Sequence, residues 1–239
     1  MEFADGGHAE ADLVVAADDI HSVLQSHVVE PRDPVFSGSI AYRGTVPADR
    51  VPDYPGTIST MWPGEGKHFL VFTLRGEALI NFVGFAPSDA EMRESCSAPS
   101  DPAALAREFA DWDPMVQRII SHVDNTFRWG LYDREPLPQW SNGRLALLGD
   151  AAHSMLPHMG QGTNQSIEDA VALAKVLEGV TTNGIPDALK HYESLRRARA
   201  GQVQLNSRNG GLVYDGGDTP ERQEKLASTV TEPALVVGF

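Results

Sequence analysis

The sequence has a single cysteine, Cys96, among its 239 residues. One cysteine cannot form a disulfide within the chain, so we expect a reducing compartment rather than a disulfide-stapled secreted domain. Basic residues are also few: 19 Lys and Arg stand against 33 Asp and Glu, which gives a net charge of −14. This balance argues against nucleic acid and anionic lipid as partners, because both attract basic surfaces.

Long apolar runs are missing as well. There is no stretch of about 18 apolar residues, so the sequence predicts no transmembrane helix and no membrane partner. Residues 1–12 are acidic and contain glycine, which is not the pattern of a signal peptide. We therefore expect a cytoplasmic protein. With 41% hydrophobic residues, the chain has enough apolar material for a sizeable core.

Strand patterns occur throughout the chain. Apolar runs at 13–17 and 144–148 are typical of strands buried on both faces of a parallel sheet. Strands at 68–74 and 78–85 are separated by Arg75-Gly76-Glu77, which predicts a hairpin. A further strand is predicted at 126–132. Cys96 lies in a polar loop between these strands.

Four helices are predicted, over 102–110, 114–122, 164–179 and 186 to about 204. The third is amphipathic and carries two acidic residues, Glu168 and Asp169, in its expected first turn. Its apolar face consists of Ile167, Ala170, Val171, Ala174 and Leu177. The Gly-rich tail from 209 to 217 is weakly specified.

These elements predict an α/β protein, α+β in its overall content, in which one domain is inserted into another. Residues 31–125 have the pattern of an antiparallel β unit with two helices, and the flanks have the pattern of an α/β layer. We expect boundaries that give pieces 1–30, 31–125 and 126–210, followed by a tail at 211–239.

The segment most informative for function begins with the apolar run that ends at Gly149-Asp150. A Gly-rich turn with Gly160 and Gly162 follows, and then the start of a helix near Asn164. In open α/β sheets, ligands bind beyond the carboxyl ends of the strands, and a helix N-terminus favours an anionic group. The alternative is that Asp150 merely caps a helix starting at Ala151 and the glycines make a turn. The residues alone leave both interpretations open.

This segment resembles the second flavin-binding motif of the FAD-dependent aromatic hydroxylases, the p-hydroxybenzoate and salicylate hydroxylase-like monooxygenases. The family pattern is Gly-Asp-Ala-Ala-His, then Pro, then Gly-x-Gly-x-Asn, then Ile-Glu-Asp-Ala, and it is present from 149 to 170. The resemblance implies that Asp150 binds the ribityl hydroxyls of FAD and that Pro157 shapes the loop. It also implies that the pyrimidine edge of the flavin meets the backbone of Gly160, Gly162, Thr163 and Asn164.

The N-terminal segment 12–23 is similar to the family motif associated with the flavin pyrophosphate and the nicotinamide nucleotide. Asp18 matches the central acid of that motif, whereas Ala16 and Asp19 stand where relatives have glycine. Gln25 stands near the usual position of an arginine. A carboxylate at Asp19 would repel a pyrophosphate.

The middle of the chain resembles the family's substrate domain through Tyr42-Arg43-Gly44 and Trp62-Pro63-Gly64. The resemblance implies that His68 and His158 are catalytic, helping to deprotonate a phenol or to hold a carboxylate, and that Arg43 pairs with an acidic substrate. Lone histidines are more often structural, and a salt bridge on the sheet explains Arg43 equally well. No metal site is expected, because His153 and His158 have no Cys or Glu partner nearby.

Taken together, the resemblance implies a partial Rossmann-like FAD-binding domain with an inserted mixed or antiparallel β-sheet substrate domain. The implied activity is an NAD(P)H-dependent oxidoreductase that hydroxylates an aromatic acid, salicylate-like or a hydroxypyridine carboxylate, through a flavin C4a-hydroperoxide. Its partners would be that small aromatic substrate and O₂, and a homodimer is compatible with the family. FAD would be the cofactor and NAD(P)H the co-substrate.

The family's Gly-x-Gly-x-x-Gly loop for the FAD pyrophosphate does not occur in this sequence. We therefore expect a truncated gene model or a fragment of such an enzyme, which retains little or no FAD on purification. The alternative to an active enzyme is a non-catalytic remnant with weak or no FAD binding.

Overall fold

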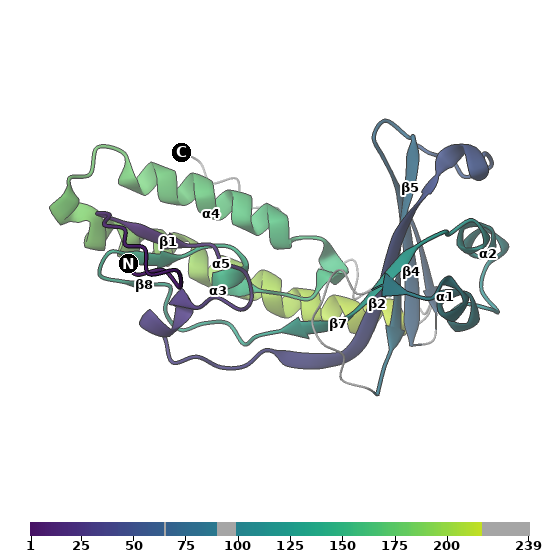
Figure 1. Cartoon of the computed structure of the whole chain (residues 1–239), viewed down its shortest axis with the longest axis horizontal. Coiled ribbons are helices and arrows are strands. Elements are labelled where there is room, and N and C mark those ends of the chain that lie inside the picture. The colour runs from purple at the N-terminus through teal and green to yellow at the C-terminus, as the bar shows by residue number, and fades with distance from the viewer. Residues whose placement is uncertain (65, 90–98, 217–239) are drawn as a thin grey trace. The chain divides into compact units, whose positions relative to one another are not determined.

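The computed structural model of the protein describes residues 1–64, 66–89 and 99–216. Its contacts define two compact units, each with its own hydrophobic core (Figure 1). Unit 1 comprises Met1–Val35 and Asp133–Asn209, and unit 2 comprises the described residues of Phe36–Tyr132 together with 210–216. Among the described residues, no helix is long and apolar enough to cross a membrane.

Unit 1 contains a three-stranded mixed sheet in the order β1-β9-β8. Strand β1 (Val14–Ala16) pairs parallel to β9 (Leu145–Leu147), and β8 (Ser141–Asn142) pairs antiparallel to β9. The parallel pairing of the two apolar runs confirms that prediction. The prediction that β1 is buried on both faces is wrong, because Val15 is 39% exposed.

Two long helices, α4 (Gly162–Leu177) and α5 (Ile185–Asp215), flank this sheet (Figure 1). Short helical segments complete the unit: η1 (Leu24–His27), α3 (Asp150–His153), η3 (Pro157–Met159) and η4 (Thr182–Gly184). The core combines apolar side chains from the sheet and both helices, among them Ala146, Leu147, Leu173, Leu189 and Tyr192. Packing of α4 and α5 on the sheet therefore fixes the carboxyl end of β9.

The orientation of α4 corrects the sequence prediction. Its apolar residues Ile167 and Val171 are 58% and 48% exposed, while Gln165 and Asp169 are buried with Ala172 and Leu173. The helix also begins at Gly162, so Glu168 and Asp169 lie beyond its first turn. The helix can bury a polar face because the side chains on that face have hydrogen-bonding partners on other elements. The spacing of apolar residues in the sequence does not reveal such partners.

Helix α5 is longer than predicted and continues to Asp215, through most of the Gly-rich tail. Contacts distant in sequence support its later turns: Arg208 pairs with Asp133 at 2.6 Å and with Glu135 at 2.8 Å. These ion pairs offset the low helix propensity of the glycines that follow.

Unit 2 contains a six-stranded sheet in the order β3-β4-β5-β2-β7-β6. Strands β4 (Lys67–Leu74) and β5 (Leu79–Pro87) form the predicted hairpin, and all three residues of its turn have positive φ. The other strands are β2 (Val35–Pro47), β3 (Thr60–Gly64), β6 (Pro99–Ser100) and β7 (Thr126–Asp133), and a short helix η2 (Ala48–Arg50) follows β2. The expected boundary at 126 is corrected, because β7 belongs to this sheet.

Helices α1 (Pro102–Glu108) and α2 (Pro114–Ser121) cover one face of this sheet (Figure 1). Each starts as its sequence predicts: the side chains of Asp101 and Asp113 accept hydrogen bonds from the N–H groups of Ala103 and Met115, and a proline follows each aspartate. The predicted loop position of Cys96 lies outside the described residues.

Candidate functional site

The carboxyl end of β9 leads into a tight turn that presents Asp150. Gly149 has φ +63°, and a Cβ placed on it would lie 3.0 Å from Ser166 Oγ, so glycine is required there for both conformation and space. Asp150 is the first residue of α3, and its side chain does not cap that helix. The structure therefore does not support the capping interpretation and leaves the carboxylate at the end of the strand.

The first turn of α4 lies beside this carboxylate. A Cβ placed on Gly162 would lie 4.0 Å from Asp150 Oδ1, and the preceding Gly160 turns the chain with φ +62°. The Gln161 side chain does not cap α4. The first N–H groups of a helix have no partner within it, so those of Gly162, Thr163 and Asn164 are suited to receive a ligand's acceptor atoms.

The pKa of Asp150 is raised above its ordinary value of 3.8. The main cause is burial of the carboxyl group among protein atoms, followed by the negative charge of Asp19, while His153 acts in the opposite direction. Asp19 has φ +71°, a conformation that favours glycine, and it accepts a hydrogen bond from the N–H of Ile20 at 2.7 Å. The residue that replaces a family glycine thus adopts a glycine-like backbone and adds charge near Asp150.

Two side chains that sequence reasoning did not assign hold the segment after β1 in place, and one of them reaches α3. Gln25 is buried, and its Nε2 donates to the carbonyl of Ala151 at 2.9 Å. Arg134 donates two hydrogen bonds to the carbonyl of Ile20, at 3.1 and 2.7 Å. Gln25 therefore links this segment to the helix that starts with Asp150. The sequence comparison showed only that Gln25 stands near the usual position of an arginine and did not indicate this structural role.

Asp18 lies in the same loop and accepts a hydrogen bond from the N–H of Val23 at 3.0 Å. It borders a pocket of about 690 Å³ within unit 1, lined mainly by apolar side chains that include Phe3, Val14, Leu24 and Leu145. Pro157 and His158 form η3, just before Gly160, and the His158 ring is buried.

Unit 2 holds the remaining predicted residues, Arg43 and His68. The ring of His68 is fully buried, with its Nδ1 2.7 Å from Asp215 Oδ1, and it stacks on Phe85 with 4.2 Å between ring centroids. Its Nδ1 is thus committed to a carboxylate on α5. The catalytic roles predicted for His68 and His158 stay predictions.

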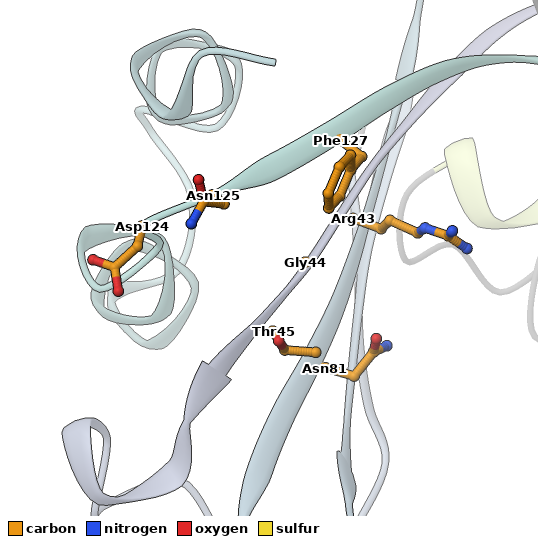
Figure 2. Close-up of a pocket in the computed structure, with 7 residues that line it drawn as sticks. All are labelled: Arg43, Gly44, Thr45, Asn81, Asp124, Asn125 and Phe127. Carbon is orange, nitrogen blue, oxygen red and sulfur yellow. The ribbon is translucent and has the colours of Figure 1, made fainter. Parts of the chain in front are cut away.

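Arg43 lines a pocket of about 400 Å³ on the sheet of unit 2 (Figure 2). The pocket is lined by Arg43, Gly44, Thr45, Asn81, Asp124, Asn125 and Phe127. The Arg43 guanidinium lies 4.9 Å from the centre of the Trp129 ring, and Asp124 is paired with Arg50 at 2.7 Å. The pocket thus combines a cation, a carboxylate that is paired with Arg50, neutral polar groups and an aromatic ring.

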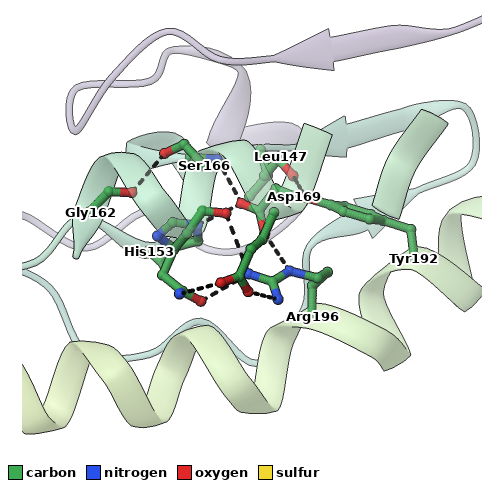
Figure 3. A network of polar contacts seen from close by, with 10 residues as sticks. Leu147, His153, Gly162, Ser166, Asp169, Tyr192 and Arg196 are labelled. Carbon is green, nitrogen blue, oxygen red and sulfur yellow. Dashed lines mark hydrogen bonds and ion pairs between the residues drawn. The ribbon is translucent and has the colours of Figure 1, made fainter. Parts of the chain in front are cut away.

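Behind the Asp150 turn lies a buried polar network centred on Asp169 (Figure 3). Its Oδ2 accepts from the Gly149 N–H at 3.2 Å and from His153 Nε2 at 2.6 Å, and its Oδ1 accepts from Arg196 Nε at 2.9 Å. Although burial alone would raise the pKa of Asp169, the hydrogen bonds and charges of His153 and Arg196 lower it. Sequence reasoning missed this network, although Asp169 belongs to the recognised motif.

The structure brings Asp150, Gly160 and the first turn of α4 together in unit 1, with the Asp18 loop packed on α3. The carboxyl end of a parallel strand, next to a helix N-terminus, is the place where α/β cofactor-binding proteins bind their nucleotide cofactors. The chain belongs to the FAD binding domain family, which matches residues 4–207. This confirms the predicted family and its cofactor.

Named relatives are similar along nearly all of the chain. A 3-amino-4-hydroxybenzoate 2-monooxygenase of Streptomyces platensis is 38% identical over 100% of the chain and 61% of its own length. A salicylate hydroxylase of Pseudomonas putida is 35% identical over 89% of the chain and 54% of its own length. The chain therefore spans little more than half the length of the curated relatives it matches.

Solved structures agree with this assignment. A salicylate hydroxylase in a substrate complex has a TM-score of 0.82 and 30% identity, covering 95% of this chain and 61% of that protein. HpxO of Klebsiella pneumoniae, solved with FAD and uric acid, also has a TM-score of 0.82, with 33% identity over 95% of this chain and 57% of that protein. The predicted α/β fold class, with helices and both mixed and antiparallel sheets, is confirmed.

Proposed function

We propose that this chain holds the isoalloxazine and ribityl part of FAD and belongs to a monooxygenase that hydroxylates an aromatic acid. The observation that carries the proposal is the position of Asp150 beside the first turn of α4, with Asp150 Oδ1 4.0 Å from a Cβ placed on Gly162. A carboxylate accepts hydrogen bonds from hydroxyl groups, and the adjacent N–H groups donate to carbonyl oxygens or to negative charge.

The backbone near Asp150 leaves room for a ligand at Gly160. A Cβ on Gly160 would meet nothing within 4 Å, so the backbone borders open space there, and one on Gly162 would make ordinary van der Waals contact with Met155 and Asp150. Pro157, at the start of η3, would shape the loop. Asp150 would bind the ribityl hydroxyls, and the N–H groups of Gly162, Thr163 and Asn164 would bind the pyrimidine edge. Asp18 would contribute from the neighbouring loop.

When bound, FAD supplies the redox chemistry that links NAD(P)H and O₂ to the aromatic ring. The overall reaction is ArH + O₂ + NAD(P)H + H⁺ → ArOH + H₂O + NAD(P)⁺. The chain's own contribution is to orient the flavin and to place positive potential from the α4 N-terminus at its pyrimidine edge. That potential would stabilise negative charge on the bound flavin.

The substrate that fits unit 2 is a small aromatic acid. Arg43 would pair with a carboxylate, while the Asn81 amide and the Phe127 ring offer polar and apolar contacts in the same pocket. Relatives are named for 3-amino-4-hydroxybenzoate, salicylate and 6-hydroxynicotinate, which are hydroxylated aromatic acids.

Two binding measurements test the two halves of this proposal. Titration of FAD into the purified chain is expected to give a saturable change in the visible flavin spectrum. Equilibrium dialysis of salicylate is expected to show affinity weakened about tenfold in Arg43→Gln, because a carboxylate would lose its charged partner. Arg128→Gln is the matched control, because Arg128 lies on the neighbouring β7 outside the pocket lining.

A chain that gives no saturable flavin change contradicts the flavin half of the proposal and supports the non-catalytic alternative. Equal salicylate affinity in Arg43→Gln and Arg128→Gln contradicts the assignment of Arg43.

A further inference from the structure

Asp169 is a buried carboxylate that joins three separate parts of unit 1. It lies on α4, and its partners are the turn at Gly149, His153 at the end of α3, and Arg196 on α5 (Figure 3). Each of these partners is a donor, so a single ionised carboxylate satisfies all three. Arg196 also donates to Gln165 and Glu168 on the same helix, which fixes the guanidinium.

The geometry ties this network to the candidate flavin site. Gly149 immediately precedes Asp150, and its N–H is the donor that Asp169 accepts. Ser166 closes the same turn: its Oγ donates to the carbonyl of Gly162, the first residue of α4, and lies 3.0 Å from the Cβ position of Gly149. The turn that carries Asp150 and the first turn of α4 are thus held against each other from behind.

We propose that Asp169 is a positioning residue of the flavin site, which fixes the Gly149 turn and thereby sets Asp150 against the first turn of α4. This inference rests on the proposed function for its ligand. Asp169 acts through Gly149 and His153 and is not itself a ligand-binding residue. Its partner His153 has no hydrogen-bond acceptor or donor for Nδ1 among the described residues, so the ring is oriented through Nε2 and Asp169.

Asp169→Asn is the informative substitution, because it keeps the size of the side chain but replaces one acceptor oxygen with a donor. An amide nitrogen at the Oδ2 position would face the Gly149 N–H, and at the Oδ1 position it would face Arg196 Nε. Either orientation leaves one donor without an acceptor. The tautomer of His153 can change to suit the amide, but the backbone N–H and the guanidinium cannot.

Two controls separate positioning from general stability. Glu168→Gln removes a charge from the same helix and from the same Arg196, but leaves the bond to Gly149 in place. Glu193→Ala removes a carboxylate that accepts from the Trp140 and Ser141 N–H groups, a comparable link of unit 1 that does not involve the Asp150 turn.

The experiment measures two quantities in wild type, Asp169→Asn and both controls. The first is amide hydrogen exchange of Gly149 relative to that of Leu173 in the core of α4. The second is the dissociation constant of FAD. We expect Asp169→Asn to accelerate Gly149 exchange relative to Leu173 and to weaken FAD binding about tenfold, with changes below about threefold in the controls.

Uniform acceleration of both amides, or equal FAD affinity in Asp169→Asn and wild type, would overturn the positioning role. If wild type itself does not bind FAD, the proposed function fails. Relative exchange of Gly149 then still decides whether Asp169 fixes the turn: selective acceleration supports that role, and unchanged relative exchange overturns it.

Discussion

Replacing Arg196 with Ala is expected to destabilise unit 1 by about 3–5 kcal/mol, because it leaves a buried carboxylate without its charged partner. Arg196 is 3% exposed and Asp169 is fully buried, and their Nε–Oδ1 distance is 2.9 Å. Water cannot replace the guanidinium at such a site without opening the packing of α4 on α5. The loss also frees the Gln165 carbonyl from its donor.

The magnitude can be measured by urea unfolding of the Arg196→Ala variant followed by circular dichroism. Lys175→Ala is the matched control, because Lys175 lies on α4 of the same unit and pairs with Glu178 at 3.0 Å with both side chains more than half exposed. A surface pair of this kind contributes about 0–1 kcal/mol. If Arg196→Ala lowers the free energy of unfolding no more than Lys175→Ala does, the Asp169 network does not stabilise unit 1 as expected.

Further outcomes follow from the same site. Gly149→Ala is expected to lower the free energy of urea unfolding by more than about 1–2 kcal/mol, and Gly143→Ala by less. Both glycines have positive φ, but only a Cβ on Gly149 would crowd Ser166. Equal losses of stability in the two variants would contradict this close contact. Asp19→Asn is expected to lower the pKa of Asp150 in an NMR titration by removing a negative charge; an unchanged pKa would contradict their proximity. Because the pKa of Asp169 is lowered in the folded protein, its ionised carboxylate stabilises the folded state at pH values above its ordinary pKa of 3.8. This stabilisation is lost as the pH falls through the lowered pKa. Acid unfolding of Arg196→Ala is therefore expected to begin at higher pH than in wild type. If the two proteins unfold at the same pH, Arg196 does not lower the pKa of Asp169.

Local patterns predicted many elements because their causes are local. Pro102 and Pro114 each follow an aspartate that caps the helix, and Arg75-Gly76-Glu77 adopts the left-handed turn that joins β4 to β5. The motif around Asp150 was recognised because it is contiguous in sequence. Its strand, turn and helix therefore needed no knowledge of distant contacts.

The missed features depend on partners far apart in the sequence. Asp169 was expected in a first helical turn, but it is buried because Arg196, 27 residues later, and His153 supply donors. The same pairing turns Ile167 and Val171 outward. Gln25 could not be assigned either, since its acceptor, the carbonyl of Ala151, lies 126 residues away.

In the proposed site, the Asp150 turn and the first turn of α4 bind the isoalloxazine and ribityl part of FAD. Fluorescence titration with FMN, which has that part but lacks the AMP moiety, tests this binding most directly, with Asp150→Ala and the exposed-site control Asp187→Ala beside wild type. We expect FMN to bind saturably and about as tightly as FAD, ADP not to compete, and Asp150→Ala alone to weaken binding about tenfold. FMN binding that is absent, displaced by ADP, or equal in wild type and Asp150→Ala would contradict it.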